Sequence, residues 1–391
     1  MGEHNFSYRM PVYLFLLAAG LSALFCLLSA SGRQEIQHEA RVINIEVPVR
    51  VFRGSAFIYN LDMDDFEVYE DGVLQRIEAV YLIKKADVAK KLERAQTFYP
   101  DVSRQFVFVF ELNEYLPKVR DVVEEFFRSV YTSGDSLYVI TPVKNYNFKK
   151  DSLTILNKEK IADQLVGILR KDLVSGNFEY RSAMKHVEEI FALEVPFDLK
   201  QSMYLNAARR LKSIKNIDEQ NLEVFADFLK GSEGQKHVFI FYQKEMIPIL
   251  EGIEDTSLIE LRKDVSFDTE RIRRIFSDSS ISVNFLFVTN KPAVIGDLDV
   301  GRMKPLRVRF MDQSYSVFNA FREVSATTGG IADSSANALA SFQKAARAVE
   351  NYYLIYYSPK DYKPDGKFRK IEVKVKNKRY RVTHRTGYFA D

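Results

Sequence analysis

The sequence Phe106-Val-Phe-Val-Phe-Glu-Leu-Asn-Glu-Tyr115 is the stretch that decides the expected fold. It begins with five consecutive apolar residues and ends in a polar loop, and an apolar helical pattern follows from Val119 to Val130. This order is typical of a buried parallel strand that enters a doubly wound sheet. Ligands of such sheets bind where loops leave the carboxyl ends of the strands. The loop of residues 111–115 is therefore the first place to look for a functional site.

The residues after this stretch continue to alternate between strand and helix patterns. Further strands are predicted at 137–141, 237–242 and 283–288. Strand-helix alternation predicts parallel pairing with right-handed crossovers. The helical patterns lie at 117–130, 159–173, 179–193, 199–214, 218–230, 268–277, 315–326 and 335–350. We therefore expect a mostly parallel sheet flanked by helices over residues 105–350.

The two ends of the chain predict strands without intervening helices. Residues 42–51 alternate between apolar and other side chains, and Asp71-Gly72 suits the tight turn of a hairpin. Residues 352–357, 368–375 and 379–384 give strand patterns again. Because each end is too short to fold alone, we expect them to pair into one small β-domain. The expected segments are a β-rich part at 41–84, a linker at 85–104, the α/β domain at 105–350 and the returning strands at 351–391.

Residues 1–32 predict export. Pro11 to Ala30 is a run of twenty residues without a charge, preceded by Arg9 and followed by small residues up to Gly32. A signal peptide has such an apolar core before a site of small residues. The same run would span about 30 Å as a helix, which is enough to cross a bilayer. Whether the segment is a cleaved signal peptide or a retained membrane anchor, the rest of the protein would be periplasmic, secreted or held at the membrane surface.

The net charge of the chain restricts the kinds of partner that we expect. The net charge is only +3, so no strong overall field would attract nucleic acid or a membrane surface. We expect membrane contact only through the N-terminal segment, and a protein of unknown identity as partner. The only cysteine, Cys26, lies in that segment, so the remainder has no disulfide and no thiol nucleophile.

Three blocks of sequence resemble the bacterial von Willebrand factor A-related proteins. The first is a valine-rich strand followed by Leu61-Asp-Met-Asp-Asp-Phe-Glu-Val-Tyr-Glu-Asp-Gly72, and the second is the α/β centre that begins at Phe106. The third combines Tyr352-Tyr-Leu-Ile-Tyr-Tyr357 with Arg385-Thr-Gly-Tyr388. The resemblance covers nearly all of the chain after residue 40. It implies an α/β fold with a von Willebrand A-like (Rossmann-like), mostly parallel sheet flanked by helices, plus a small β-domain from the N- and C-terminal strands.

The resemblance also implies a metal-ion-dependent adhesion site, in which an Asp-x-Ser-x-Ser motif, a threonine and a second aspartate hold Mg²⁺. The matching positions here are Glu111, Asn113 and Tyr115, and the second aspartate is replaced by Gln243. The threonine loop would fall near residues 176–182, where Ser182 is the nearest hydroxyl. Mg²⁺ requires near-octahedral oxygen ligands at about 2.0–2.1 Å, so each of these replacements matters. We expect a degenerate site without a metal, and Mg²⁺ or Ca²⁺ bound by Glu111 and Asn113 remains the alternative.

Other motifs give weaker signals. Asp62, Asp64 and Asp65 are similar to a calcium loop but lack its glycine and closing glutamate, so we expect them to cap a turn. Thr328-Gly-Gly330 lacks the lysine of a phosphate-binding loop, which favours a tight turn. No catalytic motif is evident in the sequence, although side chains distant in sequence can assemble a site in space.

These observations lead to a main hypothesis and two alternatives. The main one is an exported, non-enzymatic protein-interaction or adhesion-type module with a degraded metal site and no catalytic residues. Its candidate ligand-binding residues are Glu111, Asn113 and Glu114. The first alternative is a metal-dependent adhesion module that uses Glu111 and Asn113. The second is an exported hydrolase with a spatially assembled site.

Overall fold

The computed structural model describes residues 43–94, 97–148, 157–214, 219–232, 234–263, 268–276, 280–289 and 309–390. Residues 43–391 form one compact unit. The export segment predicted at residues 1–32 lies outside the described ranges. Within those ranges no helix is both long enough and apolar enough to cross a membrane.

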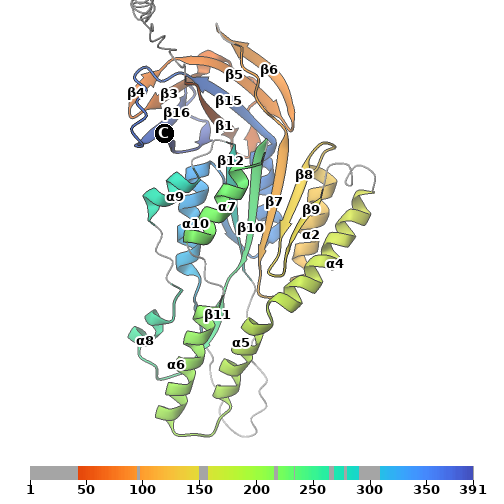
Figure 1. The fold of residues 1–391 in the computed structure, drawn as a ribbon, viewed down its shortest axis with the longest axis vertical. Coiled ribbons are helices and arrows are strands. Elements are labelled where there is room, and N and C mark those ends of the chain that lie inside the picture. Colours follow the sequence, from red (N-terminus) through yellow and green to blue (C-terminus); the bar gives the residue numbers. More distant parts are fainter. Residues whose placement is uncertain are drawn as a thin grey trace, which may run out of the picture. The chain divides into compact units, whose positions relative to one another are not determined.

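A six-stranded central sheet contains the apolar strand of residues 106–110 (Figure 1). Its order is β14-β12-β10-β7-β8-β9, with parallel pairing throughout except between β8 and β9. The strands are β7 (Arg104–Glu111), β8 (Ser136–Ile140), β9 (Asn145–Phe148), β10 (Gln235–Gln243), β12 (Ile281–Val288) and β14 (Ala332–Ser335). The central strands β10 and β12 are buried along their whole length, which explains their continuous apolar sequences.

Alternate residues of the central strands supply two separate hydrophobic cores. In β7, Phe106, Phe108 and Phe110 pack into one core, while Val107 packs into the other. The phenylalanine face is covered by α2 (Lys118–Glu125), a π-helical turn (Phe126–Val130), α4 (Lys158–Gly176) and α11 (Ala338–Glu350). The valine face is covered by α7 (Glu219–Lys230), α9 (Thr269–Ile275) and α10 (Tyr315–Thr328). The period of two along a strand thus fixes which helices each residue meets.

Two antiparallel sheets pack over a third hydrophobic core. The curled sheet has the order β17-β1-β15-β5-β6, with β2 paired to β1 (Figure 1). Its strands are β1 (Ile45–Arg53), β2 (Ala56–Phe57), β5 (Ile77–Lys84), β6 (Asp87–Glu93), β15 (Asn351–Tyr357) and β17 (Arg381–His384). The small sheet has the order β18-β16-β3-β4 and consists of β3 (Phe66–Glu70), β4 (Val73–Gln75), β16 (Phe368–Val375) and β18 (Gly387–Phe389).

Strands from the two chain ends pair in both antiparallel sheets. In the curled sheet β1 lies between β15 and β17, with Val47 opposite Ile355 and Val51 opposite Val382. In the small sheet β3 pairs with β16. The segment 85–104, for which the sequence predicts a linker, contains β6, an edge strand paired with β5.

The predicted fold class is wrong. We expected a von Willebrand A-like (Rossmann-like), mostly parallel sheet with a small β-domain attached. Ten of the fourteen strand pairings in the described ranges are antiparallel, and the fold is a mixed α/β arrangement dominated by antiparallel sheets, one of them curled. The expectation failed because strand-helix alternation reports only on the middle of the chain. The strands at the ends form more ladders than the middle does.

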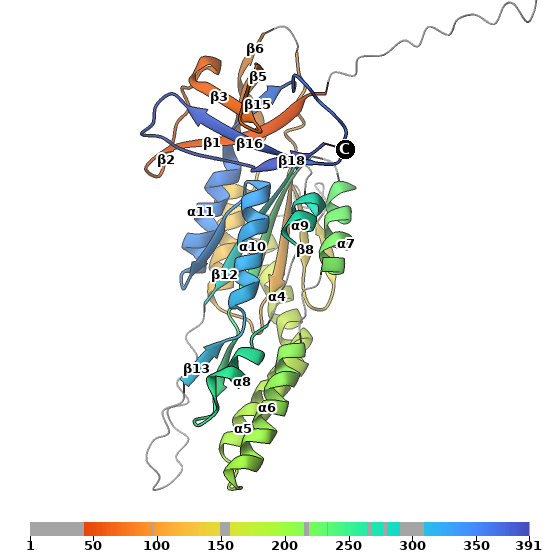
Figure 2. The ribbon, with the colours of Figure 1, turned by 90° about the vertical axis from the view of Figure 1, so that its left-hand side faces the viewer.

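A helical lobe continues from the carboxyl end of β10 (Figure 2). It consists of the helices α5 (Phe178–Phe191), α6 (Phe197–Ser213) and α8 (Asp255–Glu260). The two-stranded sheet of β11 (Met246–Ile249) and β13 (Arg309–Asp312) packs with them. Tyr180, Tyr204, Ile247 and Leu258 belong to its own hydrophobic core. The lobe therefore occupies part of the sheet edge at which ligands of parallel sheets usually bind.

Candidate functional site

The loop after β7 lies at the carboxyl edge of the central sheet. Glu111 is the last residue of β7, and Leu112 and Asn113 behind it are buried. Glu114 is exposed, and Tyr115 is partly buried against the phenylalanine core. The loop therefore presents carboxylates at its surface and is anchored beneath by apolar and amide side chains.

Gln243, at the end of β10, binds this loop through both polar atoms of its side chain. Its Oε1 accepts hydrogen bonds from the backbone N–H groups of Asn113 at 2.9 Å and Glu114 at 3.3 Å. Its Nε2 donates to Glu114 Oε1 at 3.1 Å. Because Gln243 is only 6% exposed, these bonds satisfy a buried amide. Gln243 thus links the ends of two neighbouring parallel strands.

Asn177 holds the loop from the other side, and sequence reasoning missed it. Its Nδ2 donates to the carbonyl oxygens of Leu112 and Leu173, both at 2.7 Å. The residue sits where α4 ends and α5 begins, and it is 1% exposed. Only its position between two helices could have suggested a structural role, because the contact with Leu112 spans a large sequence separation.

Tyr115 and Ser182 do not join Gln243 in a ligand set. The guanidinium of Arg170 in α4 lies 5.0 Å from the centre of the Tyr115 ring, which is a cation–π distance. Ser182 is an exposed residue of α5. Tyr115 therefore packs against α4.

Lys118 places a positive charge beside Glu114. Its Nζ donates to the carbonyl oxygens of Thr289 at 2.6 Å and Ala336 at 3.3 Å, which follow β12 and β14. Burial lowers the pKa of Lys118, and Glu114 partly offsets this change. The positive charge beside these two carbonyl groups is thus the ammonium group of Lys118.

The residues at this edge do not fit the Mg²⁺ site that the resemblance implies. Gln243 directs an amide N–H, which cannot ligate a cation, at Glu114. Glu111 lines a different feature, an apolar groove. Nowhere in the described ranges do three or more His, Cys, Asp or Glu side chains form a group that could hold a metal ion.

The aspartates at 62–65 cap a short helical turn at Met63–Asp65. The Asp62 N–H donates to Asp65 Oδ2 at 2.8 Å, as in a capping box. Asp62 also pairs with Lys90, and Asp64 pairs with Arg94 at 3.6 Å. This geometry agrees with the expected turn cap.

An apolar groove with a volume of ≈ 610 Å³ lies on the valine face of the central sheet, next to α7. Its apolar lining includes Val109, Tyr138, Ile140, Phe225, Phe228 and Phe321. Glu111, Asn145 and Asn221 supply its polar groups. A volume of this size lies within the range of ordinary ligand pockets. The groove and the Glu111 carboxylate together form a candidate binding surface.

The sequence contained one signal for this groove. The α7 segment has apolar residues at 222, 224, 225, 226, 228 and 229, which is more than one buried stripe requires. In the structure Leu222, Ala226 and Leu229 are buried, whereas Val224 is 65% and Phe228 37% exposed. The second stripe of α7 therefore faces the groove and solvent.

A buried ion pair lies deeper, at the end of β10. Lys263 Nζ is 2.8 Å from Glu245 Oε2, with side chains 3% and 1% exposed. The hydroxyl of Tyr242 donates to Glu245, and burial together with that carboxylate raises the tyrosine pKa well above its usual value. Because solvent does not reach this network, it specifies the local packing and does not meet a substrate.

A serine–histidine contact lies near the opposite edge of the sheet, but its surroundings do not suit hydrolysis. His237 Nδ1 is 3.1 Å from Ser282 Oγ. Burial, followed by Arg104 and Arg50, lowers the histidine pKa well below its usual value, which makes it a poor base at neutral pH. The adjoining cavity offers ≈ 10 Å³ to the centre of a water-sized sphere, too little for a substrate.

Comparisons with known proteins add no identification. No family model, no curated protein and no solved structure matches the chain. The resemblance to von Willebrand factor A-related proteins therefore stays a prediction from sequence, and the geometry of the groove and the adjoining loop is what bears on function.

Proposed function

We propose that the protein is an exported, non-enzymatic interaction module that binds an amphipathic helix of a partner protein in the groove beside α7. The observation that carries the proposal is the apolar lining of this groove with Glu111 at the end of β7. Export is supported by the uncharged run from Pro11 to Ala30.

A helix suits the groove because the same sheet face already accepts helices. Helix α7 packs on this face through Leu222, Ala226 and Leu229 (Figure 1). Beside it, Val109, Tyr138 and Ile140 remain only partly buried, and the Tyr138 and Phe228 rings lie 4.8 Å apart. An apolar stripe on a partner helix would cover these side chains as α7 covers its own neighbours.

Charge in the groove favours a basic residue on the partner helix. Glu111 lines the groove, and the other polar lining groups, Asn145 and Asn221, are neutral. A lysine or arginine beside the apolar stripe would meet the carboxylate in a partly desolvated setting, which strengthens the attraction. An acidic helix of the same hydrophobicity would be repelled.

The proposal is tested with two model helical peptides, one of leucine and lysine and one of leucine and glutamate, matched in length. Binding to the full chain in detergent is measured by fluorescence anisotropy, and its location by methyl NMR shifts at Ile140 and Ile240. We expect the basic peptide to bind more tightly and to shift both methyl groups. Phe228→Glu should weaken it at least tenfold, about 1.4 kcal/mol, and Glu111→Gln should reduce the preference for lysine.

The matched control is Val174→Glu, which introduces the same charge at a 45% exposed position of α4 outside the groove. It should leave peptide binding unchanged. Equal binding by Phe228→Glu and the unaltered protein would contradict the groove. A hydrolytic activity that disappears when one groove residue is replaced would contradict the non-enzymatic assignment.

A further inference from the structure

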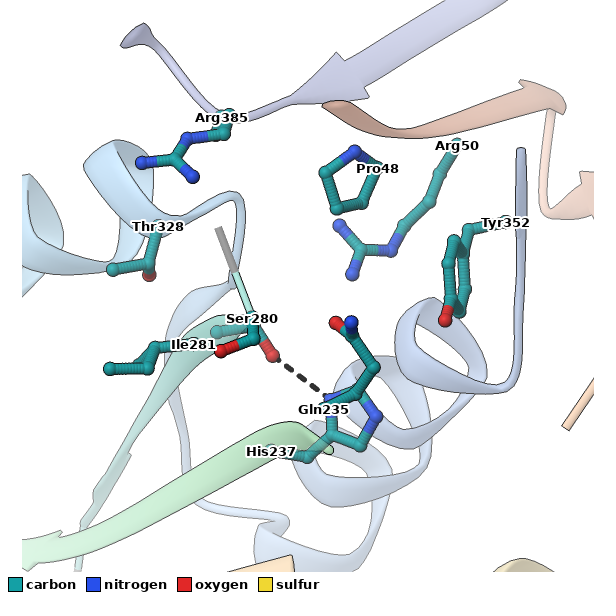
Figure 3. Close-up of a pocket in the computed structure, with 10 residues that line it drawn as sticks. Pro48, Arg50, Gln235, His237, Ser280, Ile281, Thr328, Tyr352 and Arg385 are labelled. Atoms are coloured by element: carbon teal, nitrogen blue, oxygen red, sulfur yellow. Dashed lines mark hydrogen bonds between the residues drawn. The ribbon is translucent and has the colours of Figure 1, made fainter. Parts of the chain in front are cut away.

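A small, partly open cavity lies between the curled sheet and the amino ends of β10 and β12 (Figure 3). Arg50 of β1 and Arg385 extend toward it from the side of the curled sheet, opposite Gln235 and His237 of β10. The centre of a water-sized sphere can occupy ≈ 10 Å³ of the cavity. This space is about that of one water molecule, so an ion bound here would be monoatomic, and oxyanions such as sulfate or phosphate are too large.

Arg50 brings a buried positive charge to this cavity without a carboxylate partner. It is 4% exposed, and within the described ranges it forms no ion pair. Its Nη1 donates to the carbonyl oxygen of Gly329 at 2.6 Å and its Nε to that of Ala348, at the C-terminal ends of α10 and α11. Burial lowers its pKa to about 10, so the guanidinium is charged at neutral pH. The helix ends supply only partial negative charge.

The remaining guanidinium nitrogen of Arg50, Nη2, has no hydrogen bond to any described residue. Two neighbours share this condition. The hydroxyl of Tyr352 makes no hydrogen bond within the described ranges, although the residue is only 3% exposed. His237 Nε2 is buried and has no hydrogen-bond partner there either. Buried polar atoms are normally satisfied, so the unpartnered His237 Nε2 beside the unpaired charge of Arg50 indicates an occupant.

One of the two neutral tautomers of His237 makes its unsatisfied nitrogen a donor. Its Nδ1 contacts the Ser282 hydroxyl, which can donate to it, and Nε2 then carries the proton of the neutral ring. The charged groups that act on His237 are Arg104 and Arg50, both positive. Arg104 is itself paired with Asp135 at 2.6 Å. Glu46 and Asp101 act on Tyr352 but are absent from the cavity lining.

We propose that this cavity is a binding site for a chloride-sized monovalent anion, which accepts hydrogen bonds from Arg50, His237 Nε2 and the Tyr352 hydroxyl. Arg385, which also donates to the Gly387 carbonyl at 3.0 Å, adds positive charge at the rim. The anion would connect β1 and β15 of the curled sheet with β10 of the central sheet. Its negative charge, together with the partial negative charges of the α10 and α11 ends, would balance the positive charge of Arg50.

Thermal unfolding of the full chain in detergent tests the site. The melting temperature is followed in sodium chloride and in sodium gluconate at equal ionic strength, because gluconate is too large for the cavity. We expect chloride to raise the melting temperature further than gluconate, with a dependence on concentration that reflects binding to the folded state. His237→Leu should abolish the difference. His186→Leu, at an exposed histidine of α5, is the matched control and should keep it.

Tyr352→Phe provides a second variant if His237→Leu does not fold, since it removes only one hydroxyl. It should weaken the chloride effect at least tenfold in concentration. Crystals soaked in sodium bromide should show an anomalous scattering peak between Arg50 and His237. Equal stabilisation by chloride and gluconate, or a cavity that contains only water in bromide, would overturn the proposal.

Discussion

At Gly330 the backbone lies close against strand β12 of the central sheet. A Cβ atom added there would lie 2.0 Å from the carbonyl oxygen of Val283 in β12. The preceding Gly329 ends α10 in the left-handed conformation, with φ +71°. Thr328 Oγ1 accepts a hydrogen bond from the Val283 N–H at 2.9 Å. The Thr-Gly-Gly sequence thus fixes the end of α10 against β12, as expected for a tight turn.

Gly330→Ala should destabilise the protein by about 2–4 kcal/mol, because the neighbour that must move is backbone. Gly167→Ala in α4 is the matched control. A Cβ there meets nothing within 4 Å, so alanine should stabilise the helix by about 0.5–1 kcal/mol. Urea denaturation measures both. A Gly330→Ala variant as stable as the unaltered protein would show that the β12 backbone can move to accommodate the added methyl group.

At the residue scale, the sequence located the candidate edge of the sheet but not its contacts. The strand pattern placed Glu111 at a strand end, where the structure has it. The family pattern brought Asn113 and Gln243 together, and they are joined, but through an amide–backbone hydrogen bond. Asn177 and Lys118 reach the same edge from helices. Periodicity reports which face a residue occupies, and it carries no information about such long-range hydrogen bonds.

Glu70 connects the two antiparallel sheets at the scale of elements. The hydroxyl of Tyr357 in β15 donates to Glu70 Oε2 at 2.6 Å, and that of Tyr388 in β18 donates to the same atom at 3.0 Å. Burial and this carboxylate raise the pKa of both tyrosines. One partly buried acid in β3 therefore joins the curled sheet to the small sheet.

Tyr357→Phe and Tyr388→Phe should each cost about 1–2 kcal/mol, because each removes a hydrogen bond to a charged group. The double variant should cost more than the sum, since Glu70 then loses both donors. Tyr69→Phe is the control, because its partly buried hydroxyl donates to Glu67 and not to Glu70, so it should leave the coupling between Tyr357 and Tyr388 unchanged. The coupling is measured by a double-mutant cycle in urea. Additive effects would show that solvent already satisfies Glu70.

Element predictions succeeded where apolar periodicity is long and failed where strands are short or polar. The strands expected from Phe106, Leu137, His237 and Val283 are observed as β7, β8, β10 and β12. The β6 segment, Asp-Val-Ala-Lys-Lys-Leu-Glu, was expected to belong to a linker because edge strands carry charge. Segments β9, β11 and β14 have four residues each, too few for a reliable pattern. Strand pairing direction, which decided the fold class, depends on partners far along the chain.

Among the described residues, His237 is buried and His384 is partly buried, whereas the unfolded chain would expose both. The pKa of His237 is well below its usual value because of burial, Arg104 and Arg50. The pKa of His384 is also lowered by burial, although its hydrogen bond to Arg385 and the charge of Glu372 oppose the change. The Nε2 atom of His384 accepts from the Val373 N–H at 3.2 Å, a bond that protonation would break. Both rings are therefore neutral in the folded protein.

Stability should fall as the pH drops below about 6.5, the pKa of histidine in an unfolded chain. Above that pH both states are neutral at these positions, whereas below it only the unfolded state gains protons. Each buried histidine then costs up to about 1.4 kcal/mol per pH unit. Urea denaturation in gluconate between pH 7.5 and 5 measures the slope. His384→Gln should flatten it and the exposed His186→Leu should not, and identical slopes would contradict the assignment.

The central position of β15 in the curled sheet sets the order in which the protein can mature. Strands β1 and β5, made first, lie on either side of β15 and do not pair with each other. Their shared neighbour spans residues 351–357 and becomes available only after all strands of the central sheet have been made. Until then the curled sheet lacks its middle. Completion of the curled sheet must therefore wait until residues 351–357 have been made, whatever earlier segments have already folded.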